Sequence, residues 1–190
     1  ESLVESRRYF KEADMGLRRD VRRTDPDPDV LLHLVDEPHR LWERRRDDAD
    51  TLRLRLGLGD LPVRDISVQA ESTATAPPDH FLMQVATDIR DRHRICTRLP
   101  AAFSFDSLGE VSVVGPAEGR DQLARTIAAR AALSHSPEDL YLALVVPGGA
   151  TDSWRWAVQL PHLADQTRPS LIGPMRRVFR HREVMTTDLR

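Results

Sequence analysis

The chain has 190 residues, of which 40% are hydrophobic and 31% are charged, so it can form one medium-sized domain with an appendage or two small domains. Its net charge of −2 is too small for a wholly disordered protein, and it has no run of about eighteen apolar residues that could span a bilayer. The balance of 28 basic and 30 acidic residues argues against a dedicated nucleic-acid-binding protein, and a lone Cys96 excludes an internal disulfide.

The N-terminal part of the chain predicts two helices. Residues 1–24 are rich in arginine and poor in apolar residues, which favours a helical stalk whose apolar stripe is interrupted at Gly16. Asp27 is suited to cap a second, short helix, since Pro28 fits the first helical position, and Pro38 ends it.

A strand and a longer helix follow. The run 52–58 alternates leucine and arginine with period two, which predicts a strand with leucines inward and arginines outward, continued over 63–68. Asp79 is a second capping candidate, and the apolar spacing after it predicts a helix that is closed by Pro100. Residues 101–105 are typical of a short strand.

The C-terminal half predicts a layered α/β domain. A strand at 110–114, a helix at 119–135 and a buried strand at 140–146 have the order of one right-handed βαβ unit. A last short strand is expected near 184–186. The predicted organisation is a helical stalk over 1–24 and one layered α/β domain over 25–190.

The turn at 115–121 (GPAEGRD) has the place of a phosphate-binding loop, between the predicted strand and helix. In such a loop, backbone N–H groups and the helix dipole hold phosphates, and a Lys followed by Ser or Thr completes the site. Here Gly115 and Gly119 are one residue too close, Arg120 replaces the lysine, and Asp121 replaces the hydroxyl that binds Mg²⁺.

The same turn has features that oppose anion binding. Pro116 removes one N–H, and the carboxylates of Glu118 and Asp121 are expected to occupy the free N–H groups of the helix. We interpret the turn as a degenerate nucleotide loop, with an ordinary strand-to-helix turn as an alternative. No metal site is expected, because His93 and Cys96 on one helical face supply only two ligands and zinc requires three or four.

Several short motifs in the same order resemble a known family. They are PDP at 26–28, LWERR at 41–45, LRLGLG at 54–59, LPAAFSF at 99–105, GEVSVVGP at 109–116, SHSPEDL at 134–140 and SWRWAVQLPHL at 153–163. This order is similar to the membrane-proximal cytoplasmic region of EccC, the FtsK/SpoIIIE-type ATPase of type VII (ESX) secretion systems. The resemblance covers nearly the whole chain.

The resemblance implies a stalk that follows two transmembrane helices outside this segment, then a first domain with an ATPase-like fold and a degraded nucleotide loop, then three ATPase modules. It implies a location on the cytoplasmic side of the cell membrane, no cofactor in this segment, and ATP with Mg²⁺ in the distal modules. The implied partners are other subunits of the secretion complex, a secreted protein bound through the distal modules, and further copies of the chain, a hexamer in the family.

The expected role of the segment is therefore mechanical, coupling the membrane part to the distal ATPase modules, without catalytic residues of its own. Arginine and tryptophan side chains that are expected at the surface are the predicted contact residues of the segment: Arg7, Arg8, Arg18, Arg19, Trp42, Arg44, Arg45, Trp154 and Trp156. Two alternatives stay open: an active ATP-binding module in which Arg120 substitutes for the lysine, and a DNA translocase module, which the near-neutral charge disfavours.

Overall fold

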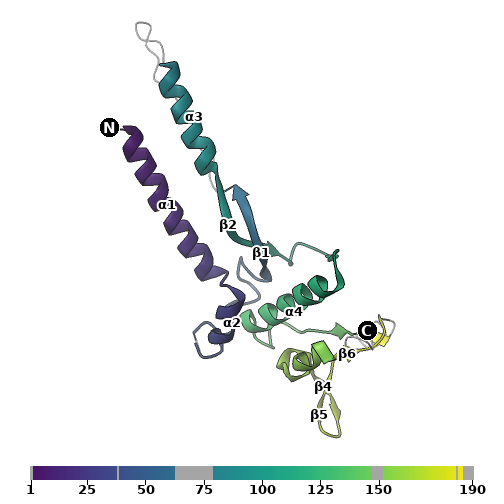
Figure 1. Ribbon diagram of the computed structural model, residues 1–190. Helices are drawn as coiled ribbons and strands as arrows, with labels where there is room; N and C mark the ends of the chain where they lie inside the picture. The colour runs from purple at the N-terminus through teal and green to yellow at the C-terminus, as the bar shows by residue number, and fades with distance from the viewer. Residues whose placement is uncertain (1, 38, 63–78, 147–151, 183, 186–190) are drawn as a thin grey trace. The chain divides into compact units, whose positions relative to one another are not determined.

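The computed structural model describes residues 2–37, 39–62, 79–146, 152–182 and 184–185 (Figure 1). Helices and small sheets are combined, which confirms the predicted α/β class. The chain divides into two compact units, Glu1–Asp27 with Gly57–Ala102 and Pro28–Leu56 with Phe103–Arg190. Each unit has buried apolar side chains of its own, and the boundary expected after residue 24 stays a prediction.

Two helices dominate the first unit. α1 (Ser2–Thr24) is the expected N-terminal helix, and it continues through Gly16 because one glycine costs a helix only about 1 kcal/mol. α3 (His80–Arg94) begins at the predicted cap, since the Asp79 carboxylate accepts bonds from the backbone N–H groups of residues 81 and 82 at 2.8 and 3.3 Å. α1 and α3 lie side by side (Figure 1) and contact each other.

α3 ends at Arg94, and strand β2 (Ile95–Ser104) follows without a loop, so the prediction that the helix extends to Pro100 is wrong. The β-branched Ile95 and Thr97 favour an extended backbone at this point. Pro100 is accommodated because β2 belongs to a two-stranded sheet, in which each strand has an edge that needs no N–H donor. Ile89, Cys96 and Leu99 are buried in this unit.

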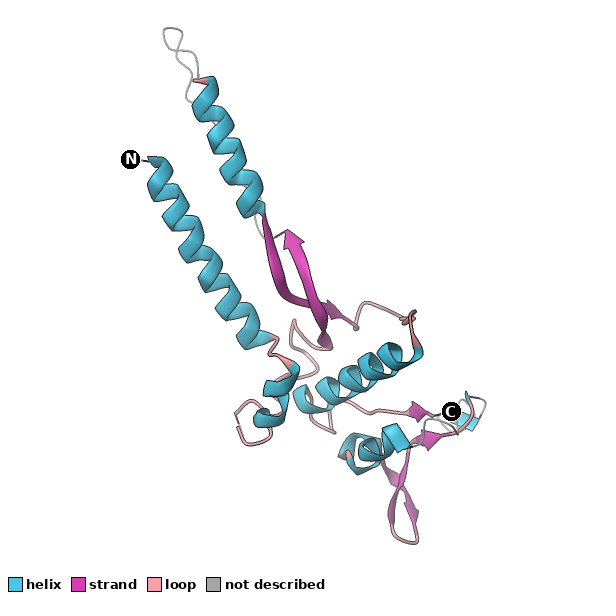
Figure 2. Ribbon diagram, in the orientation of Figure 1, coloured by secondary structure: helices cyan, strands magenta, loops and turns pink. Residues whose placement is uncertain are grey.

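Strand β1 (Arg53–Pro62) pairs with β2 and runs in the opposite direction (Figure 2). The predicted strand at 52–58 is therefore confirmed in place, while its expected continuation over 63–68 lies outside the described residues. The predicted alternation is wrong: Arg55 is as buried as its neighbour Leu54, whereas Leu58 is 48% exposed. Near the start of β1, side chains on both faces of the strand are buried. Farther along the strand, the face that carries the leucines becomes exposed.

The second unit is organised around helix α4 (Ala117–Ser134), which packs against the short helix α2 (Pro28–Leu34). Two 3₁₀ helices, η2 (Asp152–Gln159) and η3 (Pro161–Leu163), follow later in the chain. The buried side of α4 carries alanines, which allow close approach of its neighbours; the buried apolar residues of this unit include Leu31, Leu54, Ala128, Ala131, Ala132, Val146, Ala157, Leu163 and Ala164.

Two small sheets complete the second unit (Figure 2). β3 (Leu144–Val145) pairs in parallel with β6 (Val178–Phe179), and β4 (Ala164–Ser170) pairs with β5 (Gly173–Arg176) in an antiparallel hairpin. The predicted strand at 140–146 is thus shorter than expected, and its parallel partner comes from the C-terminal part of the chain.

The predicted βαβ unit is wrong, because residues 110–114 have no regular secondary structure. Their β-branched residues have local strand propensity, but no neighbouring strand in the described residues pairs with them, and Val114 is 92% exposed. α4 begins at Ala117, two residues before the predicted start. The last strand expected near 184–186 is also wrong over its described part, where Val184 and Met185 are helical.

Candidate functional site

The turn at 115–121 leads into α4 and contains the residues predicted for a degenerate nucleotide loop. Gly115 has a φ of 151°, Pro116 is the N-cap residue without a side-chain capping bond, and Gly119 already lies in the first turn of the helix. Residues 114–120 are all exposed. Without a strand in front of it, this turn does not have the strand–loop–helix arrangement by which a phosphate-binding loop curls its amides round an anion.

The two acids of the turn act differently from what the sequence predicts. Asp121 is the fifth residue of α4, beyond the free N–H groups of the first turn, and its carboxylate lies 3.8 Å from Nη1 of Arg125. The expectation that Asp121 fills the helix N-terminus is therefore wrong, because the helix begins earlier than predicted. Glu118 is in the first turn, where a negative charge favours the helix dipole. Arg120, in the place of the lysine, donates its backbone N–H to the Pro116 carbonyl at 3.0 Å.

A set of polar contacts lies at the other end of α4, its C-terminus. The last carbonyls of a helix have no partner within the helix, and a buried carbonyl without a donor is costly. At this end each carbonyl from 131 to 135 accepts a named donor. The donors are the His135 backbone N–H and Nδ1 for residue 131, Trp42 Nε1 for 132, the Trp42 backbone N–H for 133, the Arg44 backbone N–H for 134, and His162 Nε2 for 135.

Trp42 and Arg44 therefore have structural roles. The sequence analysis had predicted them as partner contacts because tryptophan and arginine are common in protein interfaces. Trp42 Nε1 lies 3.1 Å from the Ala132 carbonyl, and its backbone has a φ of 58°, which turns the chain toward the helix end. Arg44 is 5% exposed; its Nε lies 3.0 Å from a carboxylate oxygen of Asp50, and its Nη1 donates to the Arg53 carbonyl. The burial of Arg44 argues against a role in binding a partner.

Two buried histidines complete this junction. Nε2 of His135 accepts the backbone N–H of Leu52 at 3.1 Å, so the proton of the neutral ring is on Nδ1, which donates to the Ala131 carbonyl at 3.0 Å. Nε2 of His162 donates to the His135 carbonyl at 2.8 Å, and its buried Nδ1 has no hydrogen-bond partner. Burial lowers the pKa of His135 and of His162, because the charged ring would lose its hydration.

Sequence reasoning assigned no role to either histidine. Their positions in the sequence gave some indication of a capping role, because His135 directly follows a long helix and His162 lies in a short Pro-His-Leu turn. Neither position, however, carries a local pattern that reveals the other, since their contact joins residues 27 positions apart. Their tautomers and burial become apparent only from the fold.

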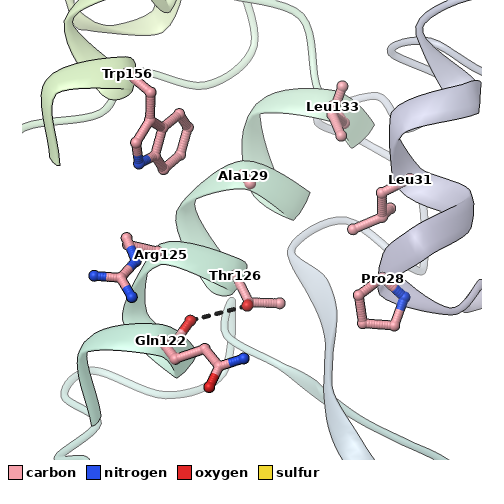
Figure 3. Close-up of a pocket in the computed structure, with 8 residues that line it drawn as sticks. All are labelled: Pro28, Leu31, Gln122, Arg125, Thr126, Ala129, Leu133 and Trp156. Carbon is pink, nitrogen blue, oxygen red and sulfur yellow. Dashed lines mark hydrogen bonds between the residues drawn. The ribbon is translucent and has the colours of Figure 1, made fainter. Parts of the chain in front are cut away.

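A groove of about 300 Å³ lies between α2, α4 and η2 (Figure 3). Its apolar lining includes Leu31, Ala129, Leu133 and Trp156, and the polar Gln122 and Arg125 lie toward the start of α4. Trp156 is 38% exposed and stacks on Trp154, with ring centroids 6.2 Å apart. The predicted contact residue Trp156 thus lines a concave, largely apolar surface, which suits an apolar side chain better than a charged ligand.

The remaining predicted contact residues lie on α1 and after Trp42. Arg8 pairs with Glu12 at 3.7 Å, and Arg18 donates to the Thr97 carbonyl at 2.8 Å, within the first unit. Arg19 is exposed. Arg45 has an exposed side chain 3.6 Å from Asp139. The side chain of Arg7 lies outside the described part of the structure, and the contact roles of these residues stay predictions.

His93 and Cys96 do not share a helical face, because α3 ends between them. Cys96 is buried, and His93 stacks on Phe10 and lies 3.2 Å from the Asp14 carboxylate, which joins α3 to α1. Among the residues that the structure describes, no three acidic, histidine or cysteine side chains gather as metal ligands. In the same ranges, every helix is too short or too polar to cross a bilayer.

No family model matches the chain. The chain is, however, similar to several proteins of ESX secretion systems. The ESX-4 secretion system protein EccC4 of Mycobacterium tuberculosis is 29% identical over 156 residues, which is 82% of this chain. The ESX secretion system protein EccC of Thermomonospora curvata is 28% identical over 177 residues, 92% of this chain. The ESX-1 secretion system protein EccCa1 of Mycobacterium tuberculosis is 25% identical over 168 residues, 83% of this chain.

The match covers only a part of each relative. The chain spans 12% of EccC4, 13% of the Thermomonospora curvata protein and 22% of EccCa1. The similarity thus extends over most of this chain, while most of each relative has no counterpart in it.

Proposed function

We propose that this chain, which is similar to a segment of EccC proteins over most of its length, is a cytoplasmic, membrane-proximal part of a type VII secretion motor. In this role it links the membrane-embedded part of the protein to distal ATPase modules and contacts other subunits of the complex. It transmits movement and does not hydrolyse ATP itself. Such a role requires a rigid body with contact surfaces.

The observation that carries this proposal is the turn in front of α4. Its residues 114–120 are exposed, no strand precedes it, and its acid Asp121 lies beside Arg125. A loop that binds a nucleotide requires several backbone N–H groups directed at one point and a cation beside it. This turn has an exposed Arg120 but no such cradle, which supports a segment that does not bind ATP.

The closed end of α4 supports the mechanical part of the proposal. Trp42 and Arg44 come from one segment and His162 from a distant one, and each of the three donates to a carbonyl at the end of α4. Such a junction holds these segments together through directional bonds, so a force applied at one of them reaches the others. A coupling element needs this property.

The test of ATP binding is photolabelling of the full-length protein with 8-azido-ATP and Mg²⁺, followed by peptide mapping. We expect no labelled peptide from residues 105–125, and we expect Arg120→Ala to leave the labelling unchanged. Arg19→Ala, at an exposed position of α1, is the matched control. A labelled peptide from this region that disappears in Arg120→Ala would overturn the proposal and favour an active ATP-binding module.

The test of coupling is secretion by cells that carry Trp42→Ala in the full-length protein. We expect less secreted substrate while the distal parts of the protein keep their azido-ATP labelling, because the change loosens the α4 junction only. Phe81→Ala serves as the control, because it removes an aromatic side chain that is 73% exposed on α3, outside the junction. Normal secretion with Trp42→Ala at normal protein levels would contradict a coupling role.

A further inference from the structure

The hairpin β4–β5 has two aliphatic side chains in its turn. Leu171 and Ile172 are 106% and 99% exposed, and the hairpin extends away from α4 (Figure 1). Single exposed apolar residues are common on protein surfaces, but two adjacent residues with full exposure form a small apolar projection. We call Leu171 and Ile172 the tip.

The side chains of the tip do not stabilise the turn. Ser170 Oγ donates to the Gly173 carbonyl at 2.7 Å, and Gly173 has a φ of 129°, which favours glycine. Two-residue turns between strands ordinarily contain Asn, Asp or Gly, and a β-branched residue such as Ile172 is disfavoured there. The fold of the hairpin therefore does not explain why the tip is aliphatic.

The sequence around the tip is basic. Residues 166–182 contain no aspartate or glutamate, although the whole chain has a net charge of −2. The same stretch contains five arginines: Arg168, Arg176, Arg177, Arg180 and Arg182. Within the hairpin, the carboxylate of Asp165 lies 3.2 Å from Arg177, so the positive charges of Arg168 and Arg176 determine the sign of the hairpin's net charge.

The base of the hairpin is fixed, so the tip is held in place. Nη1 of Arg176 donates to the Leu160 carbonyl at 3.1 Å, and Arg177 donates to the Ala164 carbonyl at 3.0 Å. A carbonyl is neutral, so it does not cancel the charge of Arg176. A side chain on a fixed support loses little conformational entropy when it binds.

We propose that the tip inserts into the interface of a membrane that contains anionic lipids, with Arg168 and Arg176 beside the lipid phosphates. The inference rests on the proposed function for its setting, because a membrane-proximal segment already has a high effective concentration at the lipid surface. It adds to that function a defined contact between this segment and lipid.

The spacing of the residues along the hairpin suits this arrangement. Arg176 follows Ile172 by four residues, which corresponds to about 13 Å along a strand, and Arg168 precedes Leu171 by about 10 Å. Apolar side chains at a membrane surface lie about 5–10 Å deep, at the boundary between headgroups and acyl chains. The arginines therefore lie at headgroup level when the tip reaches the acyl chains.

A lipid surface fits the tip better than a nucleic acid or a protein pocket does. Surfaces that bind single-stranded nucleic acid combine cations with aromatic side chains that stack on bases, whereas the tip is aliphatic. A protein pocket must match the shape of the tip, while acyl chains accept any aliphatic side chain and lipid phosphates supply the opposite charge. Two aliphatic side chains give only weak binding, so the hairpin is a second contact of a protein that is anchored elsewhere.

The test is photocrosslinking of the full-length protein in vesicles of phosphatidylcholine in which about one lipid in three is phosphatidylglycerol. With benzoylphenylalanine in place of Leu171, we expect the peptide that contains position 171 to gain the mass of a phospholipid. In vesicles of phosphatidylcholine alone, the yield of this adduct should fall about tenfold. Adducts only with protein, or equal yields in the two kinds of vesicle, would overturn the proposal.

The same probe at Val114 is the positional control. Val114 is 92% exposed in the same unit, but the nearest charged residues on either side of it in the sequence are Glu110 and Glu118. This position should give no lipid adduct, and a yield equal to that from position 171 would overturn the proposal. A mixed-sequence RNA added to the vesicles should leave the adduct at position 171 unchanged, and a tenfold decrease would instead indicate a nucleic acid as the occupant, against the proposal.

Two substitutions, each combined with the probe at position 171, separate the apolar and the electrostatic parts of the contact. Ile172→Ser should lower the adduct yield about tenfold, because it removes aliphatic surface from the tip. Arg168→Gln should lower the yield about fivefold, the equivalent of about 1 kcal/mol for one cation at an anionic surface. Arg155→Gln, at an exposed position of η2, is the matched control and should have no effect.

Unchanged yields with both Ile172→Ser and Arg168→Gln, in proteins that circular dichroism shows to be folded, would overturn the proposal. Failure of the proposed function has different signs, namely azido-ATP labelling within residues 105–125 or normal secretion with Trp42→Ala. Neither of these measurements depends on the hairpin, so the two failures are distinguishable.

Discussion

Trp42→Phe tests the interpretation that the segment around Trp42 closes the C-terminal end of α4. The substitution keeps an aromatic ring and removes the Nε1–H that donates to the Ala132 carbonyl at 3.1 Å. Ala132 is 3% exposed, so water replaces the lost donor poorly. An unsatisfied buried acceptor costs about 1–3 kcal/mol, so we expect a loss of about 2 kcal/mol, which for a chain of this length lowers the Tm by about 4–8 °C.

The assay combines thermal unfolding, followed by circular dichroism at 222 nm, with amide hydrogen exchange. Because the chain has two units, the exchange data show where the stability is lost. We expect faster exchange in the last turn of α4 and unchanged exchange in α3. Trp156→Phe, in the groove, is the control and should change stability by less than about 0.5 kcal/mol. A Trp42→Phe protein with the wild-type Tm and unchanged exchange near Ala132 would refute the reasoning.

Three further predictions concern other contacts. Burial lowers the pKa of His135 and of His162, so as the pH falls the unfolded chain takes up protons before the folded chain does. The free energy of unfolding should therefore decrease below about pH 6.5. Urea midpoints measured at two pH values would show this decrease. A constant midpoint down to about pH 5 would contradict this. Asp79→Ala should destabilise α3 by about 0.5–2 kcal/mol, with faster exchange confined to its first turn. Asp14→Asn should weaken the contact between α1 and α3 at His93 and accelerate exchange in α1, and equal exchange in the two proteins would count against that contact.

Features of the fold that depend on neighbouring residues could be predicted from the sequence. Asp79 caps α3 through its own side chain and the N–H groups two and three residues on, so the pattern contains the whole interaction. The same holds for α2, which begins at Pro28 as expected. The strand from Arg53 was also predictable, because its alternating pattern extends over seven residues.

Features that depend on distant residues could not be predicted. Residues 110–114 have the composition of a strand, but a strand exists only where another one pairs with it, and β3 pairs instead with Val178 and Phe179. The end of α3 was misplaced because Pro100 is a strong signal for a helix end, whereas Ile95 and Thr97 turn the backbone to a strand earlier. The start of α4 shifted by two residues, and this shift alone changed the role of Asp121.

The junction at the end of α4 also changes how the resemblance to EccC should be used to find partner surfaces. Three of the motifs that carry the resemblance supply Trp42, His135 and His162, and each of these residues donates to a carbonyl inside the second unit. Their pattern is therefore explained by the need to close one helix end and requires no partner. A contact surface should instead be sought where side chains are exposed without a role in the fold. In the described part of this unit, Val114, Leu171 and Ile172 are each more than nine-tenths exposed, so the surfaces round them are better places to look for a contact than the motifs are.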